Sequence, residues 1–276
     1  MSDEKSLKYN EPWILQRADP YVYRHTDGSY YFTASVPAYD GIVLRRAGTL
    51  AELSGAEEVM VWKKHESGPM SYHIWAPEIH YLFGKWYIYF AGGEAEDIWK
   101  IRPYVLECSG DDPLTDEWVE LGKMKRAAED EFSFEAFSLD ATVFENKGEY
   151  YYVWAEKVGV GKMISNLYIA KMESGNQLKT VQVLLTTPDY DWERKGFWVN
   201  EGPAVIHHDG KMFLTYSASE TGVDYCVGML SIDEDADILD PRLWKKERYP
   251  VLKTCEKLGI YGPGHNSFTM DEDGND

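Results

Sequence analysis

The sequence has little cysteine, few basic residues and no long apolar run. Its three cysteines, Cys108, Cys226 and Cys255, lie far apart and form no C-x-x-C pair, which argues against a disulfide framework and against a zinc site. The 28 Lys and Arg against 47 Asp and Glu leave a net charge of −19, and such an acidic surface repels phosphate, so no nucleic-acid partner is expected. No stretch approaches the ~18 apolar residues of a membrane-spanning helix, so no membrane partner is expected either.

The first twelve residues are polar and contain no apolar core of a signal peptide. The sequence as it stands therefore predicts a cytoplasmic protein, or a secreted one if a leader has been removed. Nothing in the composition divides the chain, so residues 1–276 are expected to form one domain. The oligomeric state is left open.

Aromatic residues are abundant, at 14% of the chain, with 20 Tyr, 10 Phe and 10 Trp. They gather in short apolar runs at 30–33, 86–90, 150–154 and 212–216, each bounded by glycine and charged residues, which is typical of buried strands. No long stretch has a sustained helical period, and the best helical candidate is the short piece 50–53. The pattern predicts an all-β fold.

A glycine-containing turn precedes each aromatic run and recurs once more near the end of the chain. The five turn glycines are Gly28, Gly84, Gly148, Gly210 and Gly274, which lie 56, 64, 62 and 64 residues apart. A fixed period with about four strand-like segments per unit is typical of a β-propeller, and five turns predict five blades. The expected strands are 22–25, 29–35, 42–46 and 58–62 in the first unit, and 141–145, 149–156, 166–171 and 180–186 in the third.

A second feature repeats in the same register. Nine residues before the turn glycines, within one position, the sequence places Asp19, Trp75, Asp140, Glu201 and His265. This is the start of the innermost strand of each blade, and because innermost strands line the propeller axis, these side chains are expected to converge there.

Converging carboxylates favour glycoside hydrolysis. Neighbouring negative charges raise the pKa of at least one carboxyl group, which separates a proton donor from an ionised base. A glycosidase needs this division, since an acid protonates the leaving oxygen while a carboxylate activates water or attacks directly. Surrounding Trp and Tyr rings suit neutral sugars.

These segments resemble glycoside hydrolase family 43, the five-bladed-propeller arabinofuranosidases, xylosidases and arabinanases. The resemblance rests on five motifs in order, QRADP (16–20), WAPE (75–78), SLDA (138–141), NEGP (200–203) and GPGHNS (262–267). It implies an inverting mechanism in which Asp19 is the general base, Glu201 the general acid, and Asp140 the residue that raises the pKa of Glu201 and orients it. Within the family, the chain looks most like exo-acting α-L-arabinofuranosidases acting on arabinan- or arabinoxylan-type oligosaccharides.

Further residues are candidates for substrate binding. Trp75 could stack on a sugar or pack in the core, Asn166 could face the pocket or serve a turn, and Glu78 could bind substrate or replace Glu201 as the acid. The resemblance implies no required cofactor, and no metal ligand is certain. His265 could hold a water molecule, or a structural calcium ion at the axis through water, although a single histidine is a weak signal for an ion that prefers six or more oxygen ligands.

The family pattern continues beyond the His-Asn-Ser segment, whereas this sequence stops where the next aromatic strand would begin. The fifth blade is therefore expected to be incomplete in this chain, which places its activity in question, because an open sheet edge is a liability. The alternatives that remain are a β-xylosidase or endo-arabinanase of the same family, a retaining fructan-cleaving propeller, and a sugar-binding propeller that has lost turnover.

Overall fold

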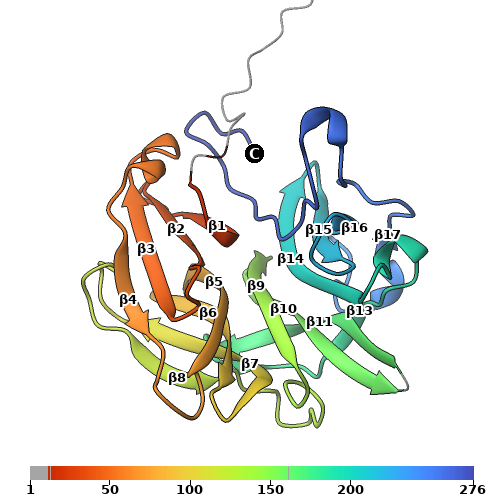
Figure 1. Ribbon diagram of the computed structural model, residues 1–276, viewed down its shortest axis with the longest axis horizontal. Coiled ribbons are helices and arrows are strands. Elements are labelled where there is room, and N and C mark those ends of the chain that lie inside the picture. Colours follow the sequence, from red (N-terminus) through yellow and green to blue (C-terminus); the bar gives the residue numbers. More distant parts are fainter. Residues whose placement is uncertain (1–11, 13, 161) are drawn as a thin grey trace, which may run out of the picture.

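The computed structural model describes residues 12, 14–160 and 162–276, and in these residues every regular element is a β-strand or a short 3₁₀ helix (Figure 1). The predicted all-β class is confirmed. The first residues, on which the expectation about a leader rests, lie outside the described part except for Pro12. No helix in the described ranges is long and apolar enough to cross a membrane.

The strands form four antiparallel blades around a common centre (Figure 1). Each blade is an antiparallel meander. Blade 1 consists of β1 (Ala18–Arg24), β2 (Tyr30–Ser35), β3 (Gly41–Ala47) and β4 (Val59–Lys63); blade 2 of β5 (Tyr72–Leu82), β6 (Lys85–Glu94), β7 (Asp97–Cys108) and β8 (Val119–Lys123). Blade 3 consists of β9 (Ser138–Asn146), β10 (Glu149–Val160), β11 (Lys162–Ser174) and β13 (Val183–Thr186), with the short β12 (Gln177–Leu178); blade 4 of β14 (Trp198–His208), β15 (Lys211–Ala218), β16 (Cys226–Asp233) and β17 (Lys245–Lys246). A short parallel pairing of β11 with β14 makes the third and fourth blades one continuous sheet.

The expected strands of the first and third units are present, with ends shifted by a few residues. The predicted helical piece at 50–53 is the 3₁₀ helix η1 (Ala51–Ser54). Three more 3₁₀ turns lie in loops, η2 (Asp191–Glu193), η3 (Pro241–Leu243) and η4 (Glu256–Leu258).

The repeat arises from the hairpin between the first and second strand of each blade. In blades 2, 3 and 4 this hairpin is a two-residue turn, and in blade 2 both turn residues have positive φ, Phe83 at 51° and Gly84 at 76°. Such a type I′ turn matches the twist of the flanking strands and favours glycine, which explains the regular spacing of the glycines.

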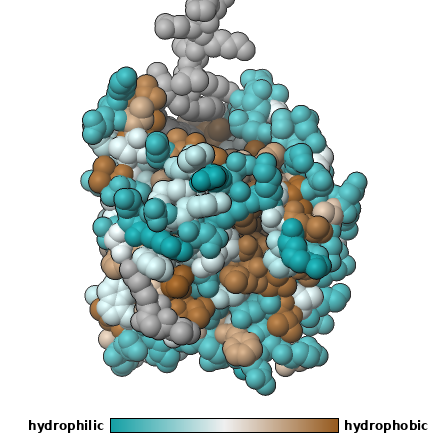
Figure 2. Space-filling model, turned by 90° about the vertical axis from the view of Figure 1, so that its right-hand side faces the viewer, coloured by the Kyte–Doolittle hydropathy of each residue, from teal (hydrophilic) through white to brown (hydrophobic). Residues whose placement is uncertain are grey.

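The aromatic runs form the second strand of every blade, and they are buried because adjacent blades cover both faces. Trp86, Trp154, Tyr89 and Tyr152 are at most 2% exposed. Three clusters join blade 1 to blade 2, blade 2 to blade 3, and blade 3 to blade 4. The face shown in Figure 2 is mostly hydrophilic, with separate hydrophobic patches.

The last residues occupy the place of the innermost strand of a fifth blade. The His265 amide donates to Ser217 Oγ of blade 4 at 2.6 Å, and further along Tyr30 Oη of blade 1 donates to the Met270 carbonyl at 2.9 Å. This segment thus bridges blades 4 and 1 (Figure 1). The fold is that of a five-bladed propeller, and in the described residues the fifth position holds this one extended segment, as expected from the sequence.

Candidate active site

The innermost strands share a β-bulge that turns selected side chains toward the centre. The pairing register of β1, β5, β9 and β14 with the second strands shifts at this bulge. A residue with positive φ lies inside each bulge and at the matching point of the fifth segment: Asp19 (54°), Ala76 (46°), Asp140 (51°), Gly202 (53°) and His265 (47°). Bulges re-aim side chains in this way next to active sites.

This geometry refines the register read from the sequence. Asp19, Asp140 and His265 occupy the bulge position itself, whereas Glu201 and Trp75 lie one residue before it. The Glu201 side chain therefore starts one residue earlier along its strand than the side chains of the two aspartates.

A cavity of about 700 Å³ lies at the centre, and the structure brings Asp19, Asp140, Glu201 and His265 together on its wall. Trp75 lines the same cavity. Each of the five repeats contributes one of these five residues. The cavity therefore exists only when the blades are assembled.

His265 forms the link between the two aspartates. Its Nδ1 lies 3.1 Å from Asp19 Oδ1 and 3.7 Å from Asp140 Oδ2. Burial by itself lowers the pKa of His265, but the charges of Asp19, Asp140 and Glu201 outweigh it and raise that pKa to about 9. The site therefore contains an imidazolium ion at neutral pH.

Each carboxylate also has a second partner. Ser35 Oγ donates to Asp19 Oδ2 at 2.6 Å, and Ser35 Oγ in turn accepts the Ala76 amide at 2.7 Å, which ties blade 1 to blade 2. Asp140 Oδ2 accepts the amide of Gly202 at 3.2 Å. Since Gly202 follows Glu201 directly, this bond fixes the backbone that carries Glu201.

The pKa of Glu201 is raised, first by burial and then by the charge of Asp19. A hydrogen bond from Tyr225 Oη to Glu201 Oε1 at 2.8 Å, together with the charges of His265 and Lys157, acts in the opposite direction. The pKa of Asp140 is also raised, by burial most and then by the charges of Glu201 and Asp19. Burial contributes more than neighbouring charge in both cases, whereas the pattern of acidic residues in the sequence points to charge alone.

Aromatic rings surround the mouth of the cavity. Trp75 lies 4.2 Å from His73 and 5.9 Å from Tyr39 between ring centroids, and Trp99 contacts the same His73 at 5.1 Å. Trp99 is 60% exposed and Phe197 65% exposed, although both line the cavity. They present flat apolar faces where a sugar would enter.

Two candidates lie elsewhere, outside the set of residues that line the cavity. Glu78 follows the bulge of β5, where its Oε2 pairs with His80 Nε2 at 2.9 Å, although its charge still helps to raise the pKa of His265. Asn166 is buried on β11, and its Nδ2 donates to Tyr168 Oη at 3.2 Å.

The sequence reasoning missed Tyr225, Lys157, Trp99 and Phe197. Tyr225 directly precedes β16, and Phe197 directly precedes β14, so both lie at strand starts facing the centre. Phe137 directly precedes β9 in the same way and lines the cavity too, so a phenylalanine before the innermost strand in blades 3 and 4 is a signal that could have found Phe197.

Comparison with known proteins adds independent evidence. The family described as "Glycosyl hydrolases family 43" matches residues 9–276. An "Extracellular exo-alpha-(1->5)-L-arabinofuranosidase" of Streptomyces avermitilis is 49% identical over 98% of this chain, and a protein of the same description from Streptomyces chartreusis is 48% identical over 96%. The chain spans 55% of the length of the first relative and 79% of the second. A crystal structure described as an alpha-L-arabinofuranosidase from Lactobacillus brevis superposes with a TM-score of 0.88 at 51% identity, covering 96% of this chain and 82% of that one.

Proposed function

The chain belongs to glycosyl hydrolases family 43, and from that premise we propose that it removes terminal α-L-arabinofuranosyl residues from arabinan- or arabinoxylan-type oligosaccharides by an inverting acid–base mechanism. The observation that carries the proposal is the single cavity in which Asp19, Asp140, Glu201 and His265 meet beneath an aromatic rim. The names of the similar proteins support the choice of arabinofuranoside as substrate.

Glu201 is the general acid in this proposal. Its raised pKa keeps the carboxyl group protonated to higher pH than an exposed glutamate, and the proton passes to the glycosidic oxygen as the bond to the anomeric carbon breaks. Tyr225, which donates to Oε1, leaves Oε2 to carry this proton.

Asp19 is the general base. Ser35 and His265 each contact one of its oxygens, which holds the carboxylate in place and stabilises its charge. A water molecule on the opposite face of the sugar from Glu201 gives its proton to Asp19 and attacks the anomeric carbon, so the configuration inverts.

Asp140 is a positioning residue. It holds the Gly202 amide beside Glu201, and the charge of Glu201 helps to raise the pKa of Asp140, so the two carboxyl groups interact. In Asp140→Asn the charge of Asp140 is lost, so the pKa of Glu201 should fall and the alkaline limb of the pH profile should move to lower pH. An unchanged alkaline limb would leave Asp140 a purely structural role.

No step runs through a metal ion. In the described residues no group of three or more His, Cys, Asp or Glu side chains is arranged to hold one.

The experiment compares hydrolysis of an aryl α-L-arabinofuranoside with that of an aryl β-D-xyloside. We expect kcat/KM for the arabinofuranoside to be at least roughly tenfold higher, which corresponds to about 1.4 kcal/mol of differential transition-state binding. A preference for the xyloside would favour the β-xylosidase alternative, and hydrolysis of neither would favour a sugar-binding propeller. NMR of the first product distinguishes inversion from the retention expected of a fructan-type enzyme.

Linear arabinan separates exo from endo action. Release of arabinose alone supports the exo assignment, whereas a ladder of oligosaccharides would identify an endo-arabinanase. The two Streptomyces relatives are described as extracellular, which supports action outside the cell. Comparison of activity in culture medium and in cell lysate tests this part.

A further inference from the structure

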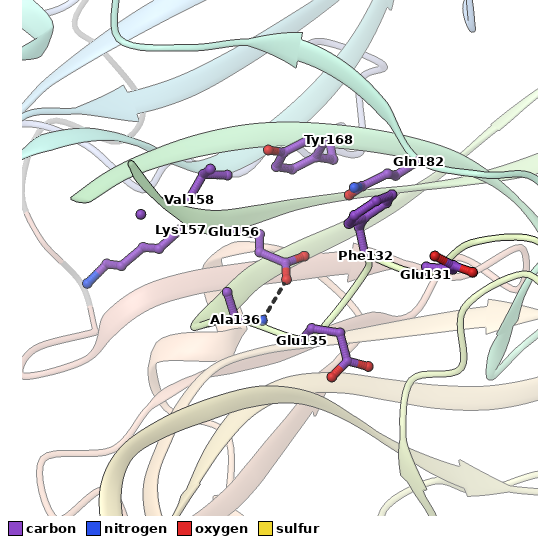
Figure 3. Close-up of a pocket in the computed structure, with 10 residues that line it drawn as sticks. Glu131, Phe132, Glu135, Ala136, Glu156, Lys157, Val158, Tyr168 and Gln182 are labelled. Carbon is purple, nitrogen blue, oxygen red and sulfur yellow. Dashed lines mark hydrogen bonds between the residues drawn. The ribbon is translucent and has the colours of Figure 1, made fainter. Parts of the chain in front are cut away.

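A second hollow, of about 500 Å³, lies beside blade 3 and is lined by Glu131, Phe132, Glu135, Glu156, Tyr168 and Gln182, among others (Figure 3). We call it the blade 3 groove. We propose that it binds a further sugar residue of the same oligosaccharide whose terminal residue occupies the catalytic cavity. This inference rests on the proposed function and adds to it a subsite for longer substrates.

The groove is built on a loop that two buried carboxylates hold in place. Asp130 accepts the amides of Phe132 at 2.8 Å, Ser133 at 3.0 Å and Gln182 at 3.0 Å. Glu156 accepts the amides of Phe134 and Ala136, both at 3.0 Å. Because both ends of the loop are fixed, little ordering cost remains when a ligand binds.

The fixed loop displays an aromatic ring to solvent. Phe132 is 68% exposed, although a large apolar side chain gains free energy by burial. Figure 3 shows its ring beside Gln182. A flat, exposed and rigidly mounted ring is the kind of surface on which the apolar face of a sugar can pack.

The polar groups of the groove suit neutral hydroxyl groups. Tyr168 lines the groove, and its Oη accepts from Asn166 Nδ2 at 3.2 Å. Glu131 and Gln182 offer oxygens that accept from sugar hydroxyls, and Glu135, whose Oε1 pairs with Arg126, offers its second oxygen.

The groove is adjacent to the catalytic cavity. Lys157 lines both hollows, and Ala136 of the groove is followed directly by Phe137 of the cavity wall. The Lys157 ammonium lies 3.8 Å from the centroid of the Phe137 ring, and the Lys157 amide donates to the Phe137 carbonyl at 2.9 Å. In Figure 3 the Lys157 side chain extends away from Phe132. A chain that leaves the cavity across this pair would reach the groove next.

Linear α-1,5-linked arabino-oligosaccharides of two to six units test the proposal, with an aryl α-L-arabinofuranoside as the short reference substrate. In the native chain, kcat/KM should rise with length. Phe132→Ala should leave kcat/KM for the aryl substrate unchanged and reduce that for the longest oligosaccharides roughly five- to tenfold, the effect of losing part of one ring contact. Phe132→Trp should retain or increase the gain with length.

Tyr249→Ala is the matched control, since Tyr249 is 71% exposed and lines neither hollow. If Phe132→Ala has the same length dependence as this control, the subsite does not exist. Weaker binding to arabinan with unchanged oligosaccharide kinetics would also overturn the proposal, because the groove would then act apart from the cavity. If the native chain hydrolyses neither substrate, the proposed function fails instead, and calorimetric titration of the two chains with arabinohexaose still tests the groove: equal Kd values would refute it.

Discussion

His265→Gln removes the imidazole that pairs with both Asp19 and Asp140, and its effect on stability can be worked out from the site. The pKa of His265 is raised to about 9 against an ordinary value of 6.5, a difference of 9 − 6.5 = 2.5 units. At about 1.36 kcal/mol per unit, the protonated ring favours the folded state by about 3 kcal/mol. The side chain is only 17% exposed, so solvent screens this interaction little.

The sign follows from the direction of the shift. Because the folded state binds the proton more tightly than the unfolded state, the contribution is complete below about pH 6.5 and disappears as the pH rises to about 9. Across this window the free energy of unfolding of the native chain should fall by about 3 kcal/mol more than that of His265→Gln.

Urea unfolding at several pH values between 6 and 9.5, on chelator-treated protein, measures this difference. His207→Gln serves as the control, because His207 forms a comparable 2.9 Å pair with Glu234 but is 38% exposed at the surface. We expect its pH dependence to follow the native chain. If His265→Gln also follows the native chain, His265 is not an imidazolium in the folded protein and the account of the site given above is wrong.

Three further predictions concern catalysis. Glu201→Gln should lose much less rate on dinitrophenyl arabinosides than on natural oligosaccharides, whereas Asp19→Asn should slow both alike by ~10²–10⁴-fold; equal losses for Glu201→Gln would show that Glu201 is not the acid. Lys157→Met should raise the pKa of Glu201 and move the alkaline limb of kcat/KM to higher pH, while Lys157→Arg should leave it in place; a shift in both variants would contradict the charge argument. Gly264→Ala places a methyl group against the ring of Tyr225. It should displace Tyr225, which donates to Glu201, and so lower kcat. Gly274→Ala, which has open space around its Cβ, should affect stability alone.

The hairpin turns explain why so much of the fold could be predicted. A type I′ turn such as Phe83-Gly84 demands positive φ, and a buried second strand demands apolar aromatic residues, so both leave local marks that recur with every blade. The helical piece at 50–53 could likewise be predicted, because its two buried leucines, Leu50 and Leu53, lie three residues apart.

The candidate site could be predicted only where it follows the same repeat. Asp19, Asp140 and His265 share one bulge position in three different blades, so counting from the turn glycines located them within one residue. Glu78 follows the bulge of β5, and its side chain pairs with His80. The spacing of the repeat does not predict this contact, because a bulge changes the direction of side chains within two residues.

The sequence by itself thus determined the propeller fold, the number of repeats and the position along the innermost strands at which the acidic residues lie. It could do so because turn chemistry and strand periodicity act between neighbours along the chain. Only the tertiary structure decided their protonation and their partners. The pKa of His265 depends on four carboxylates brought together from blades 1 to 4. That of Glu201 depends on burial and on partners distant in sequence, Tyr225 and Lys157 among them. The blade 3 groove likewise exists only where a loop, β10 and β11 meet. Charge interactions and burial depend on distances in space, and these arise only when the blades close around the axis.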